Sequence, residues 1–82
     1  MARGVYKMKD ITVLVYQKNG QCQDIQIPVN ITCKQLIDGL YSGLEAGSPI
    51  PTGIRSENPK AYITGIAKVS EMGLHHGTEL FL

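Results

Sequence analysis

The residues of this sequence best suited to chemistry are two adjacent histidines and two cysteines. His75 and His76 are consecutive, so their side chains diverge and the pair alone makes a poor metal site. We interpret them as solvent-exposed turn residues, with a surface metal ligand or a pH-sensitive contact as the alternative. Cys22 and Cys33 lack Cys-x-x-Cys spacing, so we expect two reduced thiols rather than a redox pair.

Cys33 and two serines are the remaining candidates for a nucleophile. Cys33 falls in the first turn of a predicted helix, where the helix dipole can lower the pKa of a thiol. No base is predicted beside it, so a small buried residue is the preferred interpretation. Ser42 and Ser70 lack the flanking glycines of a nucleophile elbow, and the dispersed glycines form no phosphate loop. We therefore predict no catalytic residue, no cofactor and no bound metal, and expect a protein that is not an enzyme.

Composition narrows the class of protein further. The 82 residues are 43% hydrophobic and 18% charged, which is typical of one globular domain. The net charge of +1 is spread along the chain, whereas a nucleic-acid binder usually concentrates basic charge on one face. No apolar run approaches the ~20 residues of a membrane helix. We expect a cytoplasmic protein with a flexible arm over residues 1–9 and a domain over 10–82, bound neither to nucleic acid nor into a membrane.

The elements that position these residues begin with a hairpin. Residues 11–16 alternate, with β-branched side chains on one face, and residues 22–29 repeat the pattern with Ile25 and Ile27. A two-residue turn at Asn19-Gly20 would place Val13 opposite a glutamine and mix apolar with polar residues on one face. A three-residue loop over 18–20 instead places Val13 opposite Ile25. That loop needs a left-handed residue at its end, which Gly20 supplies.

A helix is predicted after the hairpin. Thr32 is a suitable N-cap, with Gln35 as its capping-box partner. A buried stripe recurs at helical spacing in Leu36, Ile37, Leu40 and Leu44. Gly39 weakens the helix by about 1 kcal/mol against alanine, and we expect it to allow a close approach to the sheet. The helix is predicted to end between residues 44 and 47, before two prolines.

The rest of the chain predicts short strands over residues 54–57, 62–63 and 78–82. Val69 and Leu74 are expected to enter the core around a turn that begins at Ser70, and Leu80 and Leu82 to point inward. Apolar strands at both ends of the domain favour a parallel pairing of the first with the last, with the helix in the crossover. The predicted class is α+β: a mixed sheet of four to five strands with one helix packed across one face.

This arrangement resembles the ubiquitin-like β-grasp superfamily, and within it the YukD/EsaB family of type VII secretion accessory proteins. The likeness rests on the Asn19-Gly20 hairpin with its Thr-capped helix, on the strand 54–57 with its turn at Asn58, and on the ending 69–82. Family members typically end with an acidic residue after the last glycine, where this chain has Thr78. They also lack a Gly-Gly tail. The resemblance implies a non-enzymatic module that binds protein components of a secretion machine.

The uncovered face of the sheet is the candidate binding site. If Val13 and Val15 face the helix, Leu14 and Tyr16 point away from it, and Phe81 does the same in the last strand. Scattered surface hydrophobic residues need no explanation, but a contiguous aliphatic and aromatic cluster is typical of protein interfaces. We predict that Leu14, Tyr16 and Phe81 bind a protein partner. The alternatives are a ubiquitin-like modifier or sulfur carrier, disfavoured because no Gly-Gly tail follows Leu82, and an N-terminal module of a larger protein.

Overall fold

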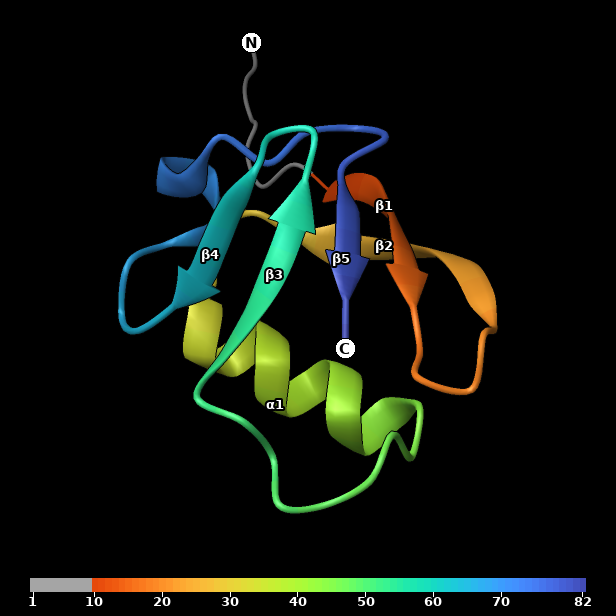
Figure 1. The fold of residues 1–82 in the computed structure, drawn as a ribbon. Coiled ribbons are helices and arrows are strands. Elements are labelled where there is room, and N and C mark those ends of the chain that lie inside the picture. Colours follow the sequence, from red (N-terminus) through yellow and green to blue (C-terminus); the bar gives the residue numbers. More distant parts are fainter. Residues whose placement is uncertain (1–9) are drawn as a thin grey trace, which may run out of the picture.

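The computed structural model describes residues 10–82, in which one five-stranded sheet packs against one helix (Figure 1). The predicted arm over residues 1–9 lies outside the described residues. The strands follow the order β2-β1-β5-β3-β4 across the sheet. Along the chain the elements are β1 (Asp10–Tyr16), β2 (Cys22–Pro28), α1 (Cys33–Gly43), β3 (Gly53–Glu57), β4 (Ala61–Thr64), the 3₁₀ helix η1 (Val69–Met72) and β5 (Glu79–Phe81).

The hairpin of β1 and β2 has the register that its apolar pattern predicts. Val13 lies opposite Ile25, and Ile11 lies opposite Ile27. The amide of Gln17 donates to the carbonyl of Gln21 at 2.8 Å, so the connecting loop spans residues 18–20. Gly20 has a φ of +90°, the left-handed conformation that this loop requires. The apolar pattern of the two strands therefore correctly predicts a three-residue connecting loop.

The first and last strands lie side by side and run parallel, as predicted. Leu14 is in register with Glu79, and Tyr16 with Phe81. The ladder continues beyond β5, because the amide of Leu82 donates to the carbonyl of Tyr16 at 2.9 Å. On its other side β5 pairs antiparallel with β3, so the last strand occupies the centre of the sheet.

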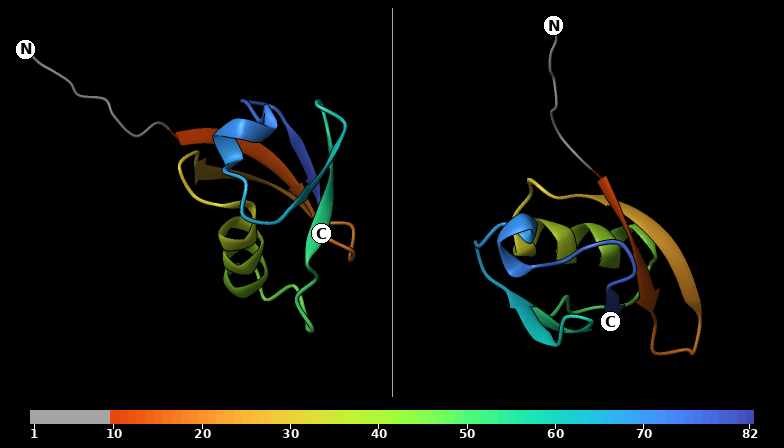
Figure 2. Two further views of the ribbon diagram at one scale, coloured as in Figure 1. Left: turned by 90° about the vertical axis from the view of Figure 1, so that its left-hand side faces the viewer. Right: turned by 90° about the horizontal axis from the view of Figure 1, so that it is seen from above.

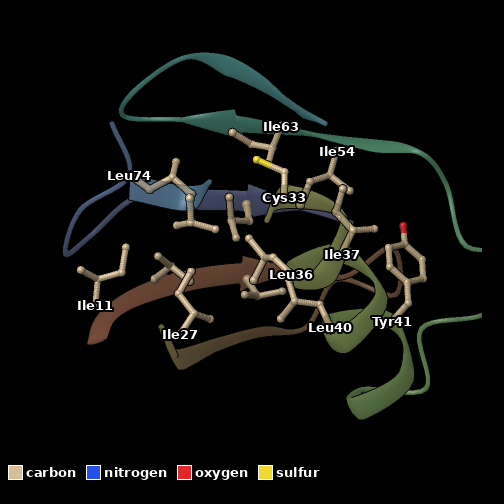
Figure 3. Packing of buried hydrophobic residues seen from close by; sticks show 14 residues of the cluster. Ile11, Ile27, Cys33, Leu36, Ile37, Leu40, Tyr41, Ile54, Ile63 and Leu74 are labelled. Atoms are coloured by element: carbon tan, nitrogen blue, oxygen red, sulfur yellow. The ribbon is translucent and has the colours of Figure 1, made fainter. Parts of the chain in front are cut away.

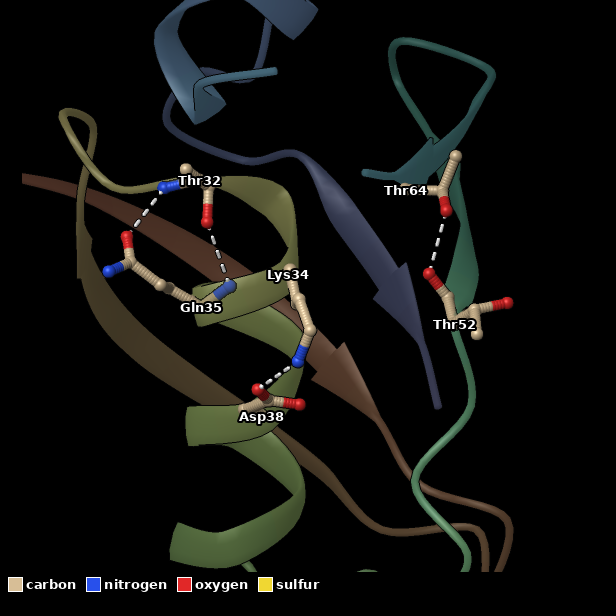
Figure 4. A network of polar contacts seen from close by, with 6 residues as sticks. All are labelled: Thr32, Lys34, Gln35, Asp38, Thr52 and Thr64. Atoms are coloured by element: carbon tan, nitrogen blue, oxygen red, sulfur yellow. Dashed lines mark hydrogen bonds and ion pairs between the residues drawn. The ribbon is translucent and has the colours of Figure 1, made fainter. Parts of the chain in front are cut away.

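Helix α1 begins with the predicted capping box (Figure 4). The Thr32 hydroxyl accepts from the amide of Gln35 at 3.1 Å, and the Gln35 side chain accepts from the amide of Thr32 at 2.9 Å. The expectation for Gly39 is wrong: a Cβ there would meet nothing within 4 Å, so no close approach to the sheet requires this glycine. Gly39 is exposed and lies off the buried stripe.

The core lies between α1 and the inner face of the sheet (Figure 3). Val13, Val15 and Leu80 are fully buried, and Val69 and Leu74 enter the cluster as predicted. Leu82 is half-buried against the same cluster. Figure 2 shows the sheet curving around α1, and among residues 10–82 no helix or strand lies over its opposite face. Aliphatic burial on one side therefore leaves the other side of the sheet open.

A buried hydroxyl group, that of Thr78, joins the turns at one end of the sheet. Thr78 is fully buried and donates to the carbonyl of Asn58 at 2.8 Å, while accepting from the amide of His75 at 3.0 Å. An ionised carboxylate could accept the second bond but could not donate the first. The threonine at this position therefore satisfies a carbonyl that the expected acidic residue would leave without a donor.

Candidate interaction surface

The open face of the sheet, which we call the outer face, carries one side-chain row that crosses all five strands. We call this the aromatic row. Each member stands in register with the next across β2, β1, β5, β3 and β4, in the order Cys22, Tyr16, Phe81, Arg55 and Tyr62. Alternation sends the members from β1, β5, β3 and β4 outward, because each has a neighbour in sequence that is buried in the core. Cys22, at the start of β2, is exposed. The row therefore follows directly from the strand order.

The centre of the aromatic row is a stacked pair. The rings of Tyr16 and Phe81 have centroids 4.9 Å apart and planes inclined by 9°. The guanidinium of Arg55 lies 4.4 Å from the centroid of the Phe81 ring, within the range of a cation–π contact. Both rings are half-buried, so part of each remains open to solvent. Parallel strands bring together two rings from opposite ends of the domain.

The ends of the row differ in chemistry. At the β2 end, hydrogen bonding with the Cys22 side chain, together with the charges of Cys22 and Glu79, raises the pKa of the Tyr16 phenol. At the β4 end, Tyr62 is 60% exposed, and its ring covers Gly53 so closely that a Cβ there would overlap the ring at 2.5 Å. Because Gly53 has no side chain, the Tyr62 ring can lie directly over its backbone on the outer face.

A second row lies beside the first. Asp24, Leu14, Glu79 and Glu57 stand in register across β2, β1, β5 and β3, and we call them the carboxylate row. Leu14 is therefore a single apolar side chain among three acids. The three predicted residues do share the outer face, since Leu14 adjoins Tyr16 along β1 and both adjoin β5.

The charged members of this surface were not predicted from the sequence. Arg55 and Glu57 alternate with the buried Ile54 and Ser56, so strand parity alone sends them outward. Their relevance depends on β3 lying next to β5, and no pattern within a strand gives the strand order. Asp24 could have been predicted, because the predicted hairpin register already places it opposite Leu14. The pairing of Glu79 with Leu14 needs the register between β1 and β5, which the sequence pattern does not give.

Cys33, His75 and His76, which were considered as candidates for chemistry, have structural roles and form no common site. Cys33 is fully buried, which agrees with the preferred interpretation of a small buried residue. Burial raises the pKa of its thiol by more than a backbone hydrogen bond lowers it, so the thiol is not activated. His75 and His76 are exposed, as predicted, but His76 also accepts from the amide of Thr12 at 3.0 Å through Nδ1. Its role there is to join the turn before β5 to the start of β1.

Two shallow pockets lie outside the outer face. One of about 300 Å³ lies between α1 and the segment 50–52, and one of about 220 Å³ lies between β2 and α1, beside Gly39. Both are lined mainly by apolar groups. Among residues 10–82, no three His, Cys, Asp or Glu side chains are grouped as metal ligands. The two charged side chains that line the first pocket, Lys34 and Asp38, are paired with each other at 2.9 Å.

The architecture of this domain matches that of a known protein. A solved structure described as "Molecular Mimicry of SUMO promotes DNA repair" superposes with a TM-score of 0.68, covering 94% of this chain and 96% of that one at 22% identity. The fold is ubiquitin-like β-grasp. No protein-family model and no curated protein matches the sequence. The ubiquitin-like β-grasp agrees with the predicted class, and its sheet of five strands is at the upper end of the predicted range.

In the part of the chain that the structure describes, the helices are too short or too polar to span a bilayer. The feature of this ubiquitin-like domain that most resembles a binding site is the outer face, with its stacked rings and its three carboxylates.

Proposed function

We propose that this domain is a non-enzymatic protein-interaction module that binds its partner through the outer face. The observation that carries the proposal is the Tyr16–Phe81 stack, with Leu14 in the adjacent row. Rigid aromatic side chains with solvent-exposed rims are favoured at the centres of protein interfaces, because they bury large areas at little cost in conformational entropy.

We further propose that the partner is a component of a type VII secretion machine. Support for this step comes from the sequence resemblance to the YukD/EsaB family, carried by the Asn19-Gly20 hairpin, the Thr32 cap and the ending 69–82. The likeness to the SUMO mimic is one of fold, at 22% identity, and its role in repair is not transferred. In this proposal the domain acts in the cytoplasm on a membrane-anchored machine.

The test is a capture experiment in a bacterium that has both this chain and such a machine. A photocrosslinking amino acid at Phe81 is expected to yield an adduct that mass spectrometry identifies as a secretion component. The double variant Leu14→Ser, Phe81→Ser is expected to lower co-purification of that component at least about tenfold, as loss of interface anchors commonly does.

The matched control removes two apolar side chains elsewhere. Ile50 and Ile66 are 38% and 85% exposed and lie off the outer face, so Ile50→Ser, Ile66→Ser is expected to leave co-purification unchanged. Amide spectra of both double variants report whether the fold is intact. If the folded Leu14, Phe81 variant binds as well as wild type, the outer face is not the site. If the crosslinked protein belongs to another process, the secretion role is wrong while the interaction stands.

A further inference from the structure

The carboxylate row imposes a chemical requirement on whatever covers the outer face. Glu79 and Glu57 stand directly opposite each other on adjacent antiparallel strands, and Asp24 lies across Leu14 in the same row. Like charges in opposed positions destabilise a sheet. Among residues 10–82 the ion pair found is Lys34–Asp38 on α1, so none of the three carboxylates contacts a cation from this part of the chain.

Arg55, the cation of the outer face that the structure describes, forms no ion pair with this row. Its guanidinium lies over the Phe81 ring, one row away from Glu79 and Glu57. A partner that covers Leu14 and Phe81 must therefore also cover or border three carboxylates. Removing an ionised carboxylate from water without a counter-charge costs several kcal/mol, which would offset much of the gain from burying the apolar groups.

We propose that the outer face docks a basic and apolar segment of a partner protein, in which Lys or Arg side chains alternate with large apolar ones. This inference rests on the proposed function and names the chemistry of the partner. Apolar side chains of such a segment would cover Leu14 and the Tyr16–Phe81 stack, while its cations would pair with Asp24, Glu57 and Glu79. The same three charges disfavour nucleic acid and anionic lipid, which would approach with phosphate groups.

The probes are two eight-residue peptides, one in which Lys alternates with Leu and Trp, and one with Glu in place of each Lys. Each is titrated into the isotopically labelled full-length protein while its amide signals are recorded. The Lys peptide is expected to shift the signals of Leu14, Glu79 and Phe81, and to bind more weakly as salt is raised from low concentration. The Glu peptide is expected to leave these signals unchanged.

Charge variants test the pairing without altering side-chain shape. Glu57→Gln, Glu79→Gln is expected to weaken the Lys peptide about two- to tenfold, the range for losing one or two exposed ion pairs. The matched control is Asp38→Asn, which removes a carboxylate on α1, away from the outer face, and is expected to have no effect. Equal binding of both peptides, or an unchanged affinity in the double variant, would overturn the inference.

Two further outcomes separate this inference from the proposed function. If Leu14→Ser, Phe81→Ser loses the cellular partner while Glu57→Gln, Glu79→Gln retains it fully, the interaction surface stands and the basic-segment proposal is wrong. If analytical ultracentrifugation instead shows that the protein dimerises and the same amide signals shift with its concentration, the occupant is a second copy, which also overturns the inference.

Discussion

The two faces of this sheet are built from the same strands and differ in almost every property. The inner face is aliphatic: Val13, Val15 and Leu80 are fully buried against α1. The outer face, one residue away along each strand, is aromatic and charged, with Tyr16 and Phe81 only half-buried. Because side chains in a strand alternate in direction, a single segment can be selected for packing on one side and for recognition on the other.

Strand β5 shows this difference between the two faces within three residues. Leu80 enters the core while Glu79 and Phe81 face outward, and all three belong to a strand of three residues. Leu80 is surrounded by protein, whereas the Phe81 ring has a stacking partner on one side, a guanidinium nearby and solvent over its remaining surface. Neighbouring positions should therefore make very different contributions to stability.

The largest expected effect follows from this pair. Leu80→Ala is expected to lower the free energy of unfolding by about 2–5 kcal/mol, because it removes buried methyl groups and leaves a cavity. Phe81→Ala is expected to cost less, because its half-buried ring loses one stacking contact worth about 0.5–1.5 kcal/mol and only part of the burial that Leu80 has. Urea denaturation of the two variants and the wild type measures both changes.

The comparison between the faces would fail if the two variants were equally destabilised. Phe81 would then be a structural residue, and the outer face would be a second packed layer rather than a free surface. Leu14→Ala, also on the outer face, gives an independent check, since it too should cost less than Leu80→Ala.

Much of the inner face could be predicted from the sequence, because it is encoded in local patterns. The alternation of apolar residues in the two strands, which places Val13 opposite Ile25, predicted the hairpin register. The pair Thr32 and Gln35 predicted where α1 begins. Gly39 was misinterpreted, since a glycine in a helix signals equally a close contact or an open position, and only the packed structure tells them apart. The composition of the outer face was harder to predict. Which residues lie beside Arg55 and Glu57 depends on the order of the strands in the sheet, and this order is not encoded within any one strand.

A smaller expected effect tests whether the outer face is organised for binding at some cost in the free energy of unfolding. Glu57→Gln is expected to raise the free energy of unfolding by about 0.2–1 kcal/mol at low salt, because it removes a like charge opposite Glu79. The gain should shrink as salt screens the pair. Thermal unfolding at two salt concentrations measures it. A loss of stability would show that Glu57 has a favourable contact and that the carboxylate row is not strained.

The smallest expected effect concerns the β2 end of the aromatic row. The pKa of the Tyr16 phenol is raised above its ordinary value of 10.0, first through its hydrogen bond with Cys22 and then through the charges of Cys22 and Glu79. Cys22→Ala should therefore move this pKa back toward 10.0. The absorbance of phenolate during an alkaline titration, taken as a difference from Tyr16→Phe in each background, isolates this group from the other tyrosines.

The sign of the accompanying change in stability is fixed by the direction of the shift. The folded protein holds the Tyr16 proton more tightly than the unfolded chain does, so the contribution is complete below about pH 10 and is lost as pH rises through the folded-state pKa. Wild type and Cys22→Ala should therefore converge in stability only in the alkaline range. If the Tyr16 titration is the same in both, the hydroxyl does not contact the thiol, and the aromatic row ends at β1 instead of continuing onto the edge strand.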